Sequence, residues 1–139
     1  VRKQAAQEPL AESLLERLSG AEALPATLRA QVKARLARAC AFAAEVAARP
    51  EQEPLARQAA SGLYHAASAA LLAWEGARLG AAGGDARRLL LARLVLAHRL
   101  EPRDPLADAE HGWDAAAGAR LLGEEPVALD EATRLLAQR

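Results

Sequence analysis

The chain has 139 residues, with 18 acidic and 18 basic side chains, 52% hydrophobic residues and only 3% aromatic ones. This length suits one domain, with room for an appendage. The single cysteine, Cys40, excludes an internal disulfide and most cysteine metal sites, so we expect it to be a small core residue. No stretch resembles a secretory signal or a membrane span, and we expect a cytoplasmic protein without membrane contact.

The composition predicts an all-α protein. Ala occurs 38 times and Leu 24 times, whereas Val occurs five times, Thr twice and Ile never. Strong helix formers therefore dominate, and the β-branched and aromatic residues that strands favour are scarce. The connections between the long helical segments are short, which favours an antiparallel up-down bundle of about four main helices with a helical C-terminal tail.

Two helices are predicted in the first third of the chain. The first spans about residues 9–19, with a leucine stripe and a stop at Gly20. The second spans about 25–48 and is ended by Pro50. The stripe of the first helix is made of Leu10, Leu14, Leu15 and Leu18. The apolar face of the second is made of Leu28, Val32, Leu36, Ala39, Ala43 and Val46.

The third predicted helix, about residues 54–80, is the one around which we expect the others to pack. Residues 58–74 contain no acid and no strong base, and Ala, Ser and Gly fill most of them. A helix that is apolar around most of its circumference belongs in the middle of a bundle. Alanine faces allow close approach but bury little area, so the leucine positions must form most of the core.

The predicted loop at 80–84 is a flexible break, followed by Asp85 as the N-cap of a fourth helix that runs to about residue 100 before Pro102. Beyond residue 103 the charge changes. Residues 25–103 carry twelve basic and six acidic side chains, whereas residues 104–139 carry three and eight. We therefore divide the chain into a basic bundle at 1–103 and an acidic helical tail at 104–139. The tail helices are expected through Leu106, Ala109, Trp113 and Ala116, and over about 128–138.

Three groups resemble chemical sites, and none has a complete set of partners. Ser61, His65 and Ser68 share a helix face, but no acid orients the imidazole. Glu110, His111 and Asp114 offer too few ligands for a metal. The glycines at 80–84 lack the spacing of a phosphate-binding loop. We therefore predict no catalytic, cofactor-binding or metal-ligating residue in this chain.

Basic residues on the second and fourth predicted helices are the best candidates for binding an anionic partner such as DNA. Stacking aromatic residues are scarce, so any nucleic-acid binding would involve the backbone and depend on salt. An ordinary solvated face is the alternative interpretation. The candidate residues are Arg29, Lys33, Arg35, Arg38, Arg87 and Arg88.

Several stretches resemble the C-terminal helical region of bacterial acyl-CoA dehydrogenase-family flavoproteins, especially the AidB-like branch. They are VRKQ at 1–4, LYHAAS at 63–68, AWEG at 73–76, RRLLLAR at 87–93, HRL at 98–100 and PRDPL at 102–106. The resemblance covers roughly residues 1–107. It implies a parent enzyme with FAD, an acyl-thioester pocket and a catalytic carboxylate, all upstream of this region. The start at Val1 likewise suggests a piece of something longer.

These observations leave three functional hypotheses. The first is a structural, assembly-forming helical module of an acyl-CoA dehydrogenase-like oxidoreductase, without catalysis or flavin in this chain. Its partners would be the dehydrogenase body or neighbouring subunits. The second is a DNA-binding module that uses the basic helices, although the neutral total charge and the acidic tail depart from that pattern. The third is a helical adaptor that binds a partner helix through an exposed leucine face.

Overall fold

The computed structural model describes residues 6–102, 106 and 112–138, and in these ranges the protein contains helices and no strand. This confirms the all-α class. The elements are α1 (Gln7–Gly20), α2 (Ala26–Ala48), the 3-10 helix η1 (Pro50–Leu55), α3 (Ala56–Ala81), α4 (Arg87–Val95), the π-helical segment η2 (Leu96–Leu100), α5 (Trp113–Leu122) and α6 (Leu129–Ala137).

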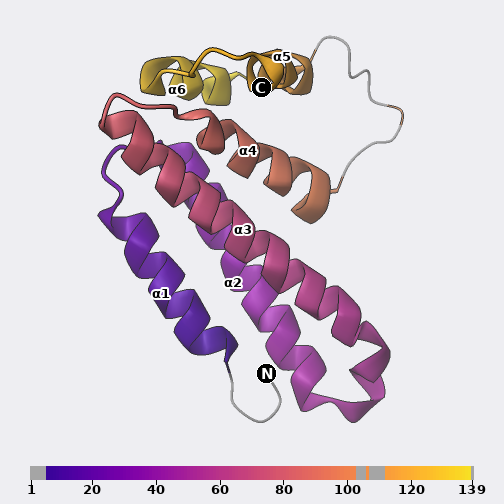
Figure 1. Cartoon of the computed structure of the whole chain (residues 1–139). Coiled ribbons are helices and arrows are strands. Elements are labelled where there is room, and N and C mark those ends of the chain that lie inside the picture. Colours follow the sequence, from indigo (N-terminus) through magenta and orange to yellow (C-terminus); the bar gives the residue numbers. More distant parts are fainter. Residues whose placement is uncertain (1–5, 103–105, 107–111, 139) are drawn as a thin grey trace.

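The long helix α3 occupies the centre of the fold, as predicted. It contacts α1, α2, α4 and α6 as well as both short helical segments. Figure 1 shows α1, α2 and α3 side by side, with α4 turning back along the C-terminal part of α3 and α5 and α6 lying across α4. The finer prediction of an up-down bundle of four main helices is not confirmed.

The core is filled by side chains that come from the neighbours of α3. All buried residues of α3 are alanine or glycine. Small residues let the flanking helices approach its backbone, and the neighbouring leucines then fill the space between them. Among the described residues, the largest fully buried side chains are Leu18, Leu28, Leu36, Leu89, Leu90, Leu96, Val32 and Val127.

The closest approach between α3 and α4 occurs at Gly76. A Cβ atom at this position would lie 2.7 Å from the backbone nitrogen of Leu89 and 3.1 Å from the carbonyl carbon of Arg88. Real Cβ atoms essentially never lie within 3.0 Å of such an atom, and 3.1 Å is tighter than most real contacts. The absence of a side chain at residue 76 therefore sets the separation of the two helices.

The predicted break at 80–84 lies at the end of α3, with its first two residues still in the helix, and its flexibility remains a prediction. Gly80 still belongs to α3 and is buried. Gly83 adopts a φ of 76°, and the N–H groups of Gly83 and Gly84 donate to the carbonyls of Gly80 and Leu79 at 3.0 and 2.9 Å. This pair of bonds is the Schellman motif, which satisfies the last carbonyls of a helix. Clustered glycines here serve helix termination and close packing.

The two C-terminal helices share the core of the preceding ones. Val127 and Ala132 are fully buried in the cluster that contains the α2 and α4 leucines. The first tail helix starts later than predicted, because α5 begins at Trp113, directly after Gly112. Leu106 lies in a turn and is 90% exposed, while Ala109 falls outside the described residues. The division at residues 103 and 104 remains a prediction.

Cys40 is free and only partly buried, and burial raises the pKa of its thiol. It packs against the main cluster from the side, which agrees with its expected role as a small apolar residue. Within the described part of the chain, no helix has the length and apolar character needed to cross a bilayer.

Candidate functional site

A groove of about 350 Å³ opens between α2, α3 and η2. We call it the basic groove, because arginines from two separate parts of the chain line it. Its apolar surface comes from Ala39, Phe42 and Leu100. The residues lining it are Arg35, Arg38, Ala39, Phe42, Gln58, Ser61, Gly62, His65, Arg99 and Leu100.

The arginines of the basic groove differ in their partners. Arg38 and Arg99 are exposed and form no ion pair with any residue of the described ranges. Arg35 lies 3.7 Å from Glu101, but the same carboxylate accepts a hydrogen bond from Arg93 at 2.9 Å. Glu101 is therefore shared, and the positive charge of the groove is largely uncompensated by the residues that line it.

Two of the other predicted basic residues are used for helix termination. Arg29 donates from Nη2 to the carbonyl of Ala21 at 2.6 Å, at the corner between α1 and α2. Lys33 donates to the hydroxyl of Ser19 at 3.1 Å. Both side chains thus stabilise the turn that follows α1, apart from the groove.

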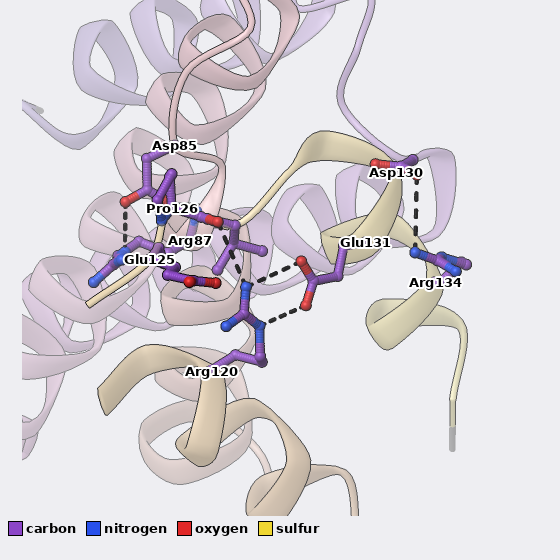
Figure 2. Close-up of polar contacts among 9 residues, drawn as sticks. Asp85, Arg87, Arg120, Glu125, Pro126, Asp130, Glu131 and Arg134 are labelled. Carbon is purple, nitrogen blue, oxygen red and sulfur yellow. Dashed lines mark hydrogen bonds and ion pairs between the residues drawn. The ribbon is translucent and has the colours of Figure 1, made fainter. Parts of the chain in front are cut away.

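Arg87 and Arg88, the last two candidates, lie at the start of α4 with acidic partners of their own. Arg88 pairs with Glu75 of α3 at 3.1 Å. Arg87 pairs with Asp85, as Figure 2 shows, and donates to the carbonyl of Glu125 at 2.9 Å. The six residues therefore do not gather in one site, and DNA binding through them remains a prediction. Only Arg35 and Arg38 reach the groove.

Asp85 joins two loops that are 42 residues apart. Its Oδ1 accepts from the N–H of Arg87 at 3.0 Å and from the N–H of Val127 at 3.1 Å. The N–H of Ala86 in turn donates to the carbonyl of Val127 at 2.8 Å. The N-cap of α4 is Ala86, one residue later than predicted, but the Asp85 carboxylate still accepts from the first turn of α4 and also holds the segment before α6. Partial burial works to raise the pKa of Asp85, but these hydrogen bonds and the Arg87 charge lower it below its ordinary 3.8.

Replacing Asp85 by alanine should lower the free energy of unfolding at pH 7 by about 0.5–2 kcal/mol, the range for losing a side chain that accepts from the first turn of a helix. Because the native pKa is lowered, the contribution of the carboxylate is complete above pH 3.8 and is lost as the pH falls through the native pKa. The difference in free energy of unfolding between wild type and the variant, measured by urea unfolding, should therefore be smaller below pH 3.8 than at pH 7. Asp130→Ala is the control, since the Asp130–Arg134 pair is exposed at 3.8 Å. Equal losses in both variants would contradict this role for Asp85.

A second polar junction connects α5 with α6. The Arg120 guanidinium donates to both carboxylate oxygens of Glu131, at 3.1 Å for the Nη2 bond, and Figure 2 shows the two side chains facing each other. The hydrogen bond to Arg120 lowers the pKa of Glu131. These contacts hold the last two helices together and offer no binding cavity.

The described residues of the candidate catalytic and metal groups make local contacts. The Ser68 hydroxyl donates to the carbonyl of Tyr64 at 2.8 Å, an ordinary contact within a helix. Glu110 and His111 lie outside the described residues, and Asp114 lies 3.2 Å from Nε2 of His98. Over the ranges that the structure describes, no three Asp, Glu, His or Cys side chains gather as a metal site would require.

One long face of α3 is only partly covered by the other helices. We call it the uncharged face; Ala60, Tyr64 and Leu71 on it are exposed, while Ala67 and Ser68 are half-buried and Ala67 touches the edge of the core. Tyr64 is 68% exposed and Leu71 is 41% exposed, whereas Leu63, Leu72 and Trp74 of the same helix pack against the core. Arg57 and Glu75 bound the face at its two ends.

Sequence reasoning missed half of the basic groove. Arg99 was not among the candidate residues, and His65 was considered only as a catalytic base. The sequence signal for Arg99 was its place in the basic last turn before Pro102, and the signal for His65 was that it is the only histidine of the third predicted helix.

No protein-family model matches the chain, and no curated protein or solved structure is detectably similar to it.

Proposed function

We propose that the chain is a non-catalytic helical module that assembles subunits of a larger protein. Its framework is the set of main helices predicted to pack antiparallel, and its contact surface is the uncharged face of α3. The exposure of Tyr64 and Leu71 on the central helix is the observation that carries this proposal. A neighbouring subunit, here a second copy of the chain, is the partner.

The uncharged face has the properties of a helix-packing surface. From Ala60 to Leu71 it extends about 17 Å along the helix axis, at 1.5 Å per residue. Ala67 and Ser68 are small, so a partner helix can lie close to the backbone between the two large side chains. Exposed tyrosine is enriched at protein interfaces, where its ring supplies area and its hydroxyl a polar contact. An ordinary solvated helix face would carry charged residues along this length.

The resemblance to acyl-CoA dehydrogenase-family flavoproteins agrees with an assembly role. In such a parent the dehydrogenase body, with its FAD, would be the other surface against which the module packs. The chain itself is then expected to purify without flavin. An absorbance spectrum with flavin bands would contradict the proposal that this module is non-catalytic.

The assembly role is tested by measuring molar mass. We expect wild-type protein to associate as concentration rises in size-exclusion chromatography with light scattering. Tyr64→Glu and Leu71→Glu should weaken association by about tenfold or more, because each places a charge in an apolar contact. Both positions are exposed in the single chain, so the helix content in circular dichroism should not change.

Leu122→Glu is the matched control, because Leu122 is 89% exposed and lies on α5, away from α3. It should associate like wild type. A wild-type chain that stays monomeric at every concentration, or three variants that behave alike, would remove the uncharged face as the site of assembly.

A further inference from the structure

We propose that the basic groove binds a small organic phosphate. The phosphate would lie against Arg38 and Arg99, and the organic part would lie on Phe42 and Leu100. This inference goes beyond the assembly role and uses a different surface from the uncharged face. It rests on the charge, the lining and the backbone geometry of the groove.

Charge gives the first argument. Three arginines line the groove, and no carboxylate does. Glu101 lies 3.7 Å from Arg35, but it pairs more closely, at 2.9 Å, with Arg93, which does not line the groove. Gathering cations without counter-charges is unfavourable, and a bound dianion relieves the repulsion. Guanidinium groups are suited to phosphate, since their planar N–H donors can bind two oxygens at once.

The lining gives the second argument and indicates the class of ligand. Phe42, Ala39 and Leu100 supply apolar surface beside the arginines. Gln58, Ser61 and His65 add polar groups that can form hydrogen bonds from the α3 side. A volume of about 350 Å³ lies at the lower end of the range for small-molecule sites. The combination suits a phosphomonoester with a compact apolar or aromatic group.

The backbone of η2 gives the third argument. Residues Leu96–Leu100 form a π-helical turn at the end of α4, and Arg99 and Leu100 of this turn line the groove. π-Helical turns are rare and occur frequently at functional sites. Here the widened turn supplies both an arginine and an apolar residue to the groove.

A small ligand fits these observations better than DNA does. Backbone binding of DNA needs many cations spread over an extended surface. Arg29, Lys33, Arg87 and Arg88 are instead held by partners elsewhere in the fold. Arg38 and Arg99, by contrast, both line the basic groove, and neither forms an ion pair with a described residue.

Isothermal titration calorimetry with phenyl phosphate tests the proposal, with inorganic phosphate and duplex DNA as further ligands. We expect saturable binding of phenyl phosphate and weaker binding of inorganic phosphate, which lacks the apolar group. Arg38→Gln and Arg99→Gln should each weaken phenyl phosphate binding by about tenfold, the equivalent of one charge-assisted contact. Arg57→Gln is the control, because Arg57 is an exposed arginine of α3 that does not line the groove.

The side chains of Arg38 and Arg99 are exposed, and circular dichroism should show both variants folded. No binding of phenyl phosphate, or equal binding by wild type and both groove variants, would overturn the proposal. Salt-sensitive DNA binding with which phenyl phosphate does not compete would also overturn it, in favour of a nucleic-acid surface.

Discussion

Alanine at position 76 should lower the free energy of unfolding by about 1–3 kcal/mol, the usual cost of overpacking a core. The added methyl group would lie 2.7 Å from the backbone nitrogen of Leu89 and 3.0 Å from its Cγ. A side chain could rotate away, but a backbone atom moves only if α4 shifts as a whole. The helix propensity of alanine offsets part of the loss, by about 0.5–1 kcal/mol. Urea unfolding followed by circular dichroism measures the net effect.

Gly62→Ala is the matched control on the same helix. A Cβ atom at Gly62 meets nothing within 4 Å. This substitution should therefore stabilise the protein by about 0.5–1 kcal/mol, through the lower conformational entropy of the unfolded chain. The two variants carry the same chemical change in one helix and should move stability in opposite directions. A change of the same sign in both would mean that α3 and α4 do not approach closely at Gly76.

Leu18→Ala should cost about 2–5 kcal/mol, the range for truncating a fully buried leucine. Leu18 has no exposed surface, and among the residues of α1 the buried ones are Gln7, Leu14 and Leu18. Helix α1 is therefore held against α2 and α3 by two leucines, and removing one leaves a cavity and loosens its docking. Hydrogen exchange should show faster exchange in α1 than in α3, together with the loss of global stability.

Leu15→Ala removes the same atoms from a more exposed position of the same helix. Leu15 is 37% exposed, so its truncation should cost less than about 1 kcal/mol. A matching loss for both variants would show that α1 does not dock through the Leu14 and Leu18 side.

Helix α2 shows how far the sequence alone can predict burial. The six positions chosen by their spacing are the six that are buried, from Leu28 to Val46. The prediction succeeded because charged residues occupy much of the remaining circumference, and only one face can be removed from water. The π-helical turn at the end of α4 left no such signal, since its residues also fit a regular helix.

Helix α3 shows where this reasoning stops. Its central position was predicted, yet Tyr64 and Leu71 are exposed and alanines fill the contacts. With no charged residue from 58 to 74, no pattern says which side faces the neighbouring helices. The choice depends on how closely α2 and α4 can approach, which is a property of the assembled fold.

The all-α class, the helical segments and the apolar face of α2 could be predicted from the sequence, because these depend on residues within a few positions of one another. The tertiary structure alone decided which face of α3 stays only partly covered, and which basic residues meet. Arg38 and Arg99 are 61 positions apart and line one groove because α2 and η2 both pack against α3. A count of charges along the sequence includes both arginines, but only the packing of distant helices places them in the same groove.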